Sequence, residues 1–138
     1  MLKGTVLQEF SGHHWIINLP DKWQAHHGTE TDSIFYQDGV GVTDIQSIMN
    51  DVTVKDADLL FYAAEYLDKA NETPPINLGD FAGFSLEYDE EDDYWWRAYL
   101  KAGHVILIIS YNCKINEKRL EIEAVKELLQ SLSVRWDI

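Results

Sequence analysis

The sequence predicts an α+β domain in which a mostly antiparallel sheet of six to seven strands packs with two principal helices. Two strand-like runs, residues 81–88 and 94–102, flank five consecutive carboxylates, and residues 105–109 form a continuous apolar run. Apolar residues recur at helical spacing in residues 53–70 and 117–132. Hairpin-connected strands combined with segregated helices are typical of an α+β domain.

The first third of the chain is predicted to hold three strands. Residues 14–19 alternate between apolar and polar side chains and end at a proline, which is typical of a short strand. Residues 21–27 are interpreted as a short helical turn. Residues 33–37 and 40–48 are predicted to form a hairpin, because an Asp-Gly pair lies between them.

Residues 53–70 give the clearest helical pattern. Thr53, followed three residues later by Asp56, resembles a capping arrangement, and an acidic first turn is favoured by the helix dipole. The predicted apolar stripe consists of Leu60, Ala63, Ala64 and Leu67.

The second half of the chain is predicted to form four strands and the closing helix. The strands are residues 76–78, 81–88, 94–102 and 105–112. Residues 105–112 carry apolar side chains on both faces, so we expect that strand to be central and covered on both sides. The closing helix is predicted over residues 117–132.

Size and charge limit the classes of partner. The chain has 138 residues, so residues 1–138 are expected to fold as one domain. The net charge is −13, which disfavours binding to nucleic acid and to anionic membranes because both are polyanionic. Residues 1–96 hold 19 acidic and 4 basic side chains. A basic protein partner suits this distribution, although the same charge also serves solubility.

We expect a cytoplasmic protein. Cys113 is the single cysteine of the sequence, so no intramolecular disulfide is possible, which fits a reducing compartment. The first fifteen residues show no apolar run long enough for a signal peptide. No segment approaches the roughly 20 apolar residues of a membrane span.

Several features together resemble the PsbP-like fold. A first strand ends in Leu19-Pro20 with Trp23 close behind, and a mid-chain helix precedes the glycine-containing strand that starts at residues 81–84. A long hairpin follows, and the last helix ends in the pattern V-x-x-L-L-x-S-L over residues 125–132. The PsbP-like fold is an α/β/α sandwich that also includes a Ran-binding nuclear-import factor. The resemblance implies a non-enzymatic binding module and carries over no catalytic residue.

The sequence also looks similar to small acidic bacterial domains of unknown function. Some of these domains are encoded beside toxin genes as immunity proteins. The resemblance therefore implies a function in which an acidic surface occludes a basic toxin.

Five consecutive carboxylates lie between two predicted strands, so they are expected at the tip of a hairpin. They are Asp89, Glu90, Glu91, Asp92 and Asp93. The run does not match a calcium-binding EF-hand loop, because its sixth position is Tyr94 rather than glycine and its twelfth is Leu100 rather than glutamate. A solvated tip and a docking loop for a basic partner are both open interpretations.

The strand that follows the acidic run divides into two faces. Residues 94, 96, 98, 100 and 102 are predicted to face the core. The other face carries Trp95, Arg97, Tyr99 and Lys101. Tryptophan, tyrosine and arginine are enriched at binding hot spots, so we predict partner contacts at Trp95, Arg97 and Tyr99. The alternative is that a helix or loop covers this face.

The histidines and the cysteine give no catalytic or metal-binding motif. Two adjacent histidine pairs occur, but neighbouring residues of a strand point to opposite faces, so one pair cannot easily chelate one ion. Cys113 has no local base that would activate it as a nucleophile. We therefore expect no metal and no cofactor.

Three functions remain open at this stage. The leading interpretation is a non-enzymatic, acidic protein-binding domain, and its most concrete form is an immunity protein that occludes a basic toxin. The first alternative is a small-ligand-binding or enzymatic domain with a pocket lined by Trp15, Trp23 and histidines. The second alternative is a self-associating structural protein. The oligomeric state is open.

Overall fold

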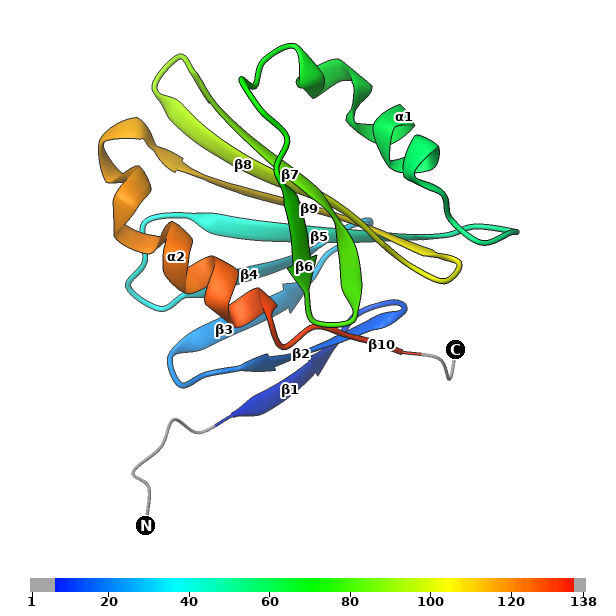
Figure 1. Cartoon of the computed structure of the whole chain (residues 1–138). Helices are drawn as coiled ribbons and strands as arrows, with labels where there is room; N and C mark the ends of the chain where they lie inside the picture. Colours follow the sequence, from blue (N-terminus) through cyan, green and yellow to red (C-terminus); the bar gives the residue numbers. More distant parts are fainter. Residues whose placement is uncertain (1–6, 136–138) are drawn as a thin grey trace.

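The computed structural model describes residues 7–135 as ten strands, two α-helices and one 3-10 turn (Figure 1). In chain order the elements are β1 (Gln8–Ser11), β2 (Trp15–Leu19), β3 (Trp23–His27), β4 (Asp32–Tyr36), β5 (Val42–Met49), α1 (Asp56–Leu67), β6 (Pro75–Leu78), β7 (Phe81–Glu90), β8 (Asp93–Ala102), β9 (Val105–Lys114), the 3-10 turn (Ile115–Glu117), α2 (Lys118–Leu129) and β10 (Ser133–Val134). The predicted α+β class is confirmed.

Two antiparallel sheets organise the strands. Seven strands form the large sheet in the order β3-β4-β5-β9-β8-β7-β6, so β9 lies at its centre as predicted. Three strands form the small sheet in the order β1-β2-β10. The small sheet joins distant parts of the chain, because Ser133 is paired with Ile16 and Val134 with Trp15.

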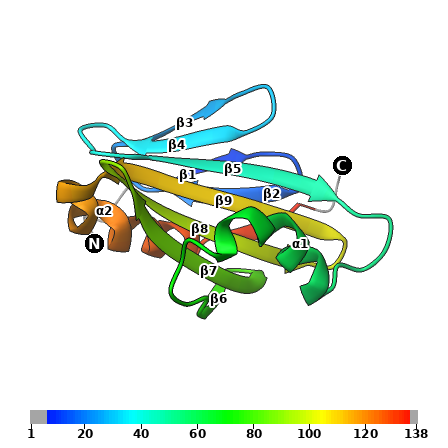
Figure 2. The same cartoon turned by 90° about the horizontal axis from the view of Figure 1, so that it is seen from above.

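The two helices lie on opposite faces of the large sheet (Figures 1 and 2). Helix α1 packs on one face, and α2 packs on the other together with the small sheet. This arrangement explains why β9 is apolar on both faces: Leu107 and Ile109 point toward α2, whereas Ile106 points toward α1, and all three are fully buried.

The larger core lies between the large sheet, α2 and β2. Trp15 and Ile17 of β2 meet Trp96 of β8 and the apolar face of α2 in one cluster. The predicted inward face of β8 is confirmed, with Tyr94, Trp96, Ala98 and Leu100 buried and Ala102 half-buried. Ile122, Val125 and Leu129 of α2 are buried in this core, as is Leu132 just beyond the helix.

The smaller core lies under α1. Leu59 and Ala63 of the helix pack against Leu86, Tyr99 and Ile106 of the sheet. The predicted stripe was wrong for Leu60 and Ala64, which are exposed, and correct for Ala63 and for Leu67, which is half-buried against the same cluster. The residues that pack on the sheet begin about one position earlier than predicted, at Leu59, because Leu59 and Ala63 face Leu86, Tyr99 and Ile106.

The cap of α1 also differs from the prediction. The N-cap residue is Lys55, and its backbone N–H donates to the Asp58 carboxylate at 2.9 Å. Thr53 lies before the helix, in the segment that leads from β5. The acidic first turn is present, with Asp56 and Asp58 near the positive end of the helix dipole.

Residues 23–27 form strand β3 rather than part of the helical turn that was predicted over residues 21–27. Strand β3 pairs along its whole length with β4, from Trp23 opposite Tyr36 to His27 opposite Asp32. It is one of the two edge strands of the large sheet, and most of its side chains are exposed, so the apolar signal is weak. Strands β1 and β10 were not predicted either, because both are short and only partly buried.

A buried carboxylate ties α2 to the connection between β4 and β5. Glu121 accepts hydrogen bonds from the Gly41 N–H at 3.1 Å, the Val40 N–H at 3.2 Å and the Tyr111 hydroxyl at 2.9 Å. Burial and the hydrogen bonds of this hydroxyl raise the pKa of Tyr111. Within residues 7–135, neither helix has the length and apolarity needed to cross a membrane.

Candidate partner-binding site

The acidic run lies at the tip of the β7–β8 hairpin, as predicted. Glu90 is paired with Asp93, so Glu91 and Asp92 form a two-residue turn. Glu91 has φ of 55°, a left-handed conformation that is unusual for a residue with a side chain. Glu91 and Asp92 are exposed, whereas Asp93 is half-buried. The turn therefore presents two carboxylates to solvent.

Three of the five carboxylates pair with lysines. Asp89 meets the Lys118 ammonium at 3.2 Å, and Asp93 meets that of Lys114 at 3.3 Å. Glu90 pairs with Lys69, and this hydrogen bond raises the pKa of the lysine. We term Asp89, Glu90, Glu91, Asp92 and Asp93 the acidic tip. Lys69, Lys114 and Lys118 thus compensate three of the five carboxylates of the acidic tip.

The unpaired charge of the tip is smaller than the sequence suggests. Among the residues that the structure describes, Glu91 and Asp92 make no ion pair. The Asp92 carbonyl accepts a hydrogen bond from the Ile115 N–H at 2.9 Å, which fixes the turn against the segment that precedes α2. A basic partner would therefore meet Glu91 and Asp92 before the other three carboxylates.

Helix α1 covers the β8 face that carries Trp95, Arg97, Tyr99 and Lys101. Tyr99 is 1% exposed and stacks on Phe84 with ring centroids 5.6 Å apart. Its burial raises the pKa of Tyr99 to about 12. Tyr99 is thus a core residue of the α1-side cluster, and it does not reach the surface as a partner contact would require.

Trp95 and Arg97 are half-buried and belong to a cation–aromatic cluster. The Arg97 guanidinium carbon lies 3.8 Å from the centroid of Tyr66 and 4.7 Å from that of Trp95. Its Nε donates to the Tyr88 hydroxyl at 3.0 Å. Tyr66 belongs to α1, so these contacts join α1 to the sheet and occupy the groups predicted to anchor a partner.

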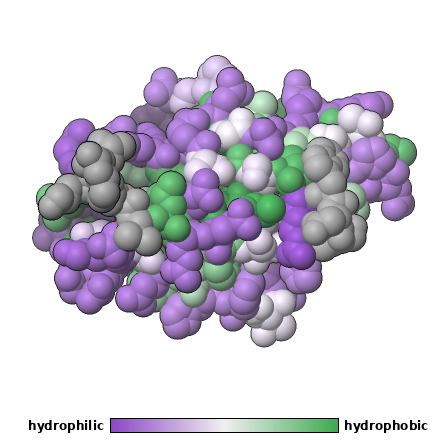
Figure 3. Space-filling model, turned by 90° about the horizontal axis from the view of Figure 1, so that it is seen from below, coloured by the Kyte–Doolittle hydropathy of each residue, from purple (hydrophilic) through white to green (hydrophobic). Residues whose placement is uncertain are grey.

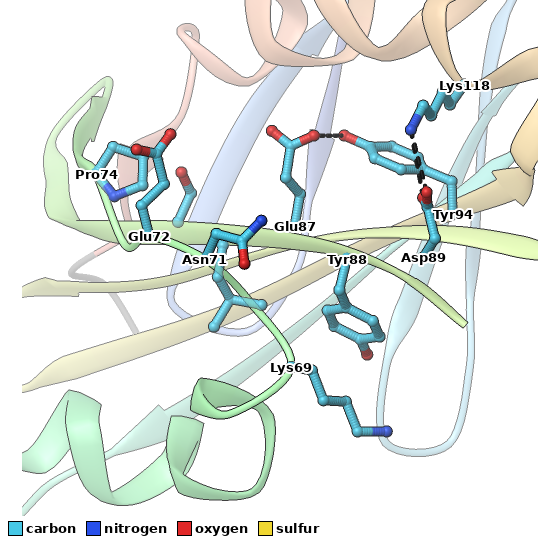
Figure 4. A pocket seen from close by; sticks show the side chains of 11 residues that line it. Lys69, Asn71, Glu72, Pro74, Glu87, Tyr88, Asp89, Tyr94 and Lys118 are labelled. Carbon is cyan, nitrogen blue, oxygen red and sulfur yellow. Dashed lines mark hydrogen bonds and ion pairs between the residues drawn. The ribbon is translucent and has the colours of Figure 1, made fainter.

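A cavity of about 530 Å³ adjoins the acidic tip (Figure 4). It lies beside β7 and the segment that connects α1 to β6. Glu87, Asp89, Tyr94 and Lys118 are on one side of β7 in Figure 4, and Tyr88 and Lys69 are on the other. Its lining residues are Lys69, Asn71, Glu72, Pro74, Ser85, Leu86, Glu87, Tyr88, Asp89, Tyr94 and Lys118.

Some of the polar groups that line this cavity form hydrogen bonds with one another. The Tyr94 hydroxyl donates to the Glu87 carboxylate at 3.1 Å, and burial followed by the charge of Glu87 raises the pKa of Tyr94. Glu72 is exposed at the cavity wall. Sequence reasoning missed Glu72 and Glu87, because they lie outside the acidic run and only the fold brings them beside it.

The predicted histidine pocket exists in part. A cavity of about 310 Å³ is lined by His13, His14, Trp15, His27 and Asp32, among others. Trp23 instead lines a separate hollow with Phe10 and His26. Asp32, which the sequence did not single out, is buried and lies 3.1 Å from the His27 ring nitrogen Nδ1.

His14 is the unusual residue of this second cavity. Its φ is 72°, and its Nδ1 is buried without a hydrogen-bond partner. Burial, then the neighbouring charges of His13 and Arg135, lower the pKa of His14. A neutral imidazole therefore presents an unsatisfied polar atom close to the cavity.

Cys113 is buried in the core and donates to the Lys114 carbonyl at 3.4 Å. Burial raises the pKa of the Cys113 thiol, which lowers the population of the nucleophilic thiolate. Across residues 7–135, no group of three or more His, Cys, Asp or Glu side chains is arranged to hold a metal ion.

The exposed surface is mainly polar. On the face shown in Figure 3, hydrophilic side chains cover most of the area and apolar side chains gather in the middle. The large apolar residues exposed over the whole described chain are Leu7, Met49, Val52, Leu60, Phe61 and Leu120. Phe61, on the outer side of α1, is the most exposed of them at 75%.

Comparison with known proteins identifies similar folds. No family model matches this sequence, and the comparison with curated proteins likewise found no match. A crystal structure of a protein from Bacteroides thetaiotaomicron matches 99% of this chain and 50% of that one, with a TM-score of 0.65 and 14% identity. This chain thus spans about half the length of that protein.

LpqN of Mycobacterium tuberculosis has a similar fold over nearly its whole length. The match has a TM-score of 0.63 and 14% identity, and it covers 94% of this chain and 92% of LpqN. LpqN is described as involved in cell envelope biogenesis. At this level of identity, both similarities concern the fold alone.

Proposed function

We propose that this chain is a non-enzymatic, acidic protein-binding domain whose partner is a basic protein. The observation that carries the proposal is the acidic tip, where Glu91 and Asp92 are exposed without an ion pair beside a cavity that Glu72 and Glu87 also line. A net charge of −13 extends the attraction over the rest of the molecule. Complementary charge speeds the encounter between two proteins.

The proposed contact surface is narrower than the sequence suggested. The acidic tip steers the partner, and the cavity beside β7 receives part of it. Trp95 and Arg97 contribute through their exposed portions, whereas Tyr99 supports the site from beneath α1. The surface therefore depends on α1 remaining docked on the sheet.

The PsbP-like assignment and the immunity function belong to the same proposal. Helix, sheet and second helix follow one another as layers, which supports the PsbP-like α/β/α sandwich. The most concrete form of the function is an immunity protein that occludes a basic toxin. A cytoplasmic location agrees with the single thiol, Cys113.

The test begins with capture of partners from host lysate at low and moderate salt, followed by mass spectrometry. The captured protein is then used in association kinetics with the double variant Glu91→Lys and Asp92→Lys, which leaves the three lysine pairs intact. We expect association about tenfold or more slower at low ionic strength, with a weaker salt dependence.

The matched control is the double variant Asp21→Lys and Asp51→Lys. It changes the net charge equally, at exposed positions outside the hairpin. An equal slowing in both double variants would mean that net charge alone drives the encounter. Unchanged association in the Glu91/Asp92 variant would refute the acidic tip as the docking site.

The second cavity favours one other function, which is binding of a small polar ligand. The unsatisfied Nδ1 of His14 supports this candidate, because a buried polar atom without a partner is costly and a ligand could satisfy it. A thermal-shift screen of small polar metabolites, repeated with His14→Phe, tests it. A ligand that raises the Tm of the wild type but not of the variant supports this function, and no stabilisation by any compound contradicts it.

A further inference from the structure

Strand β7 is longer than β6, its neighbour at the edge of the large sheet. Strand β6 pairs with only the first part of β7, from Leu78 opposite Phe81 to Pro75 opposite Phe84. The Ser85 N–H still donates to the Pro74 carbonyl at 3.0 Å, and there the pairing ends. On its other side, β7 pairs with β8 as far as Glu90. Residues 86–90 therefore form an open edge of the large sheet.

The register identifies which backbone groups face this open edge. In an antiparallel strand, alternate residues direct both their N–H and C=O toward the same neighbouring strand. Ser85 directs its N–H toward the β6 side, so Glu87 and Asp89 do the same. The backbone N–H and C=O groups of Leu86 and Tyr88 are directed toward β8. The backbone groups of Glu87 and Asp89 thus face a position where the sheet has no further strand.

The cavity of about 530 Å³ lies along this edge, and it is large enough for a short stretch of extended chain. Pro74 closes one end, and the Glu72 side chain stands at the wall. The carboxylates of Glu87 and Asp89 lie on the α2 side of the edge, while Tyr88 lies on the α1 side (Figure 4). Acidic and aromatic groups therefore alternate across the strand.

We propose that the open edge of β7 binds an extended basic segment of the partner as an additional antiparallel or parallel β-strand. The inference rests on the proposed function and specifies how the partner binds. Backbone hydrogen bonds to Glu87 and Asp89 hold the segment, as in other cases of strand addition. Lysine or arginine at alternate positions faces Glu72, Glu87 and Asp89, and small apolar residues between them face Tyr88.

Charge decides which segments the edge accepts. Charged side chains beside an exposed edge protect a protein against pairing with neutral or like-charged strands. A second copy of this edge is acidic as well, so it is repelled. Lys69 and Lys118 also line the cavity, where they pair with Glu90 and Asp89. Among the described residues Glu72 and Glu87 make no ion pair, so these two carboxylates attract a basic strand.

The test follows amide hydrogen exchange by NMR with an acetylated and amidated Lys-Val-Lys-Val-Lys-Val peptide. In the free protein, the amides of Glu87 and Asp89 exchange fast, whereas those of Leu86 and Tyr88 are protected by β8. Saturating peptide is expected to slow exchange at Glu87 and Asp89 by about tenfold or more. The matched Glu-Val peptide is expected to leave both amides unchanged.

Two N-methylated peptides separate strand pairing from charge attraction. One carries N-methyl groups on the lysines and the other on the valines, so both keep the full charge. If the peptide binds as a strand, one of the two methylated peptides has an affinity about tenfold or more lower than the other. The reason is that only the lysine N–H groups or only the valine N–H groups of the peptide face β7. The variant E72Q/E87Q is expected to bind the unmethylated peptide several-fold more weakly than the control E65Q/E127Q.

Equal binding of both methylated peptides would overturn strand addition while leaving a basic partner at the acidic tip in place. Failure of the unmethylated peptide to protect Glu87 and Asp89 would overturn it too. The proposed function is judged separately, by the association kinetics of the Glu91/Asp92 variant.

Discussion

Glu121 shows how one side chain can hold two elements together. Its carboxylate is buried and accepts hydrogen bonds from Val40, Gly41 and Tyr111. Two of these donors are backbone amides of a connection that has no regular structure of its own. Removal of the acceptor leaves buried donors unsatisfied, which costs more than a typical hydrogen bond contributes.

We expect Glu121→Ala to lower the free energy of unfolding by about 2–4 kcal/mol, and Glu121→Gln to lower it by about 1–2 kcal/mol because an acceptor oxygen remains. Urea denaturation followed by tryptophan fluorescence measures both. The control is Glu123→Ala, because the Glu123 side chain is 83% exposed. The free energy of unfolding of this variant should stay within about 0.5 kcal/mol of the wild-type value. Equal decreases in the free energy of unfolding for Glu121→Ala and Glu123→Ala would contradict the role of Glu121 as a buried acceptor.

At the residue scale, the sequence predicted the position of the acidic tip but not its ion pairs. A run of five carboxylates between two strands can only be a turn or its flanks, so its exposure is local information. Lys114 lies opposite Asp93 on the neighbouring strand β9. The other two lysines lie 21 residues before Glu90 and 29 residues after Asp89. Such distances are set by the packing of both helices on the sheet, which no local pattern encodes.

At the scale of elements, α1 shows that helical spacing predicts a helix but does not predict which of its faces packs on the sheet. Leu59 and Leu60 are neighbours in sequence, yet Leu59 is 1% exposed and Leu60 is 49% exposed. Both fit a helical repeat with other apolar residues, so spacing alone could not choose between them. The sheet decides, because Leu86, Tyr99 and Ile106 form the surface on which Leu59 and Ala63 pack.

We expect Leu59→Ala to destabilise the fold by about 2–4 kcal/mol, because it removes a fully buried side chain and leaves a cavity. Leu60→Ala should change stability by less than about 1 kcal/mol. Thermal denaturation of the two variants beside the wild type measures the difference. A larger loss from Leu60→Ala than from Leu59→Ala would place the opposite face of α1 on the sheet.

Strand β3 was predicted as a helical turn because its pattern is ambiguous. Trp23 and Ala25 pack inward, but Gln24, His26 and His27 are exposed. Five residues with two half-buried side chains fit a strand and a turn equally well. Its pairing with β4 removes the ambiguity. By contrast, β7, β8 and β9 are long, apolar and joined by tight turns, so sequence alone predicted them.

At the scale of the whole molecule, alkaline pH should unfold the protein. Burial raises the pKa of Tyr94, Tyr99 and Tyr111, and that of Tyr99 reaches about 12. The folded state therefore keeps protons that the unfolded state releases near its ordinary pKa of about 10. Stability from these groups is fully present below pH 10 and is lost as pH rises toward and above 12.

We expect three of the seven tyrosines to ionise only as the fold is lost. Absorbance of tyrosinate and far-ultraviolet circular dichroism, recorded through the same alkaline titration, measure ionisation and unfolding together. Ionisation of all seven tyrosines with the circular dichroism unchanged would contradict the burial of these hydroxyl groups. Tyr99→Phe, which cannot ionise, should shift the unfolding transition to higher pH.

The pairing of β2 with β10 has a consequence during protein synthesis. Trp15 meets Val134 only after nearly the whole described chain has been made, and α2 covers the β2 face from the same late segment. At about 5–20 residues per second, the ribosome needs roughly 6–24 seconds to span that interval. Until α2 and β10 emerge, the Trp15 side of β2 lacks part of its covering, so the nascent chain is more exposed to aggregation and to chaperones before its final strand is made.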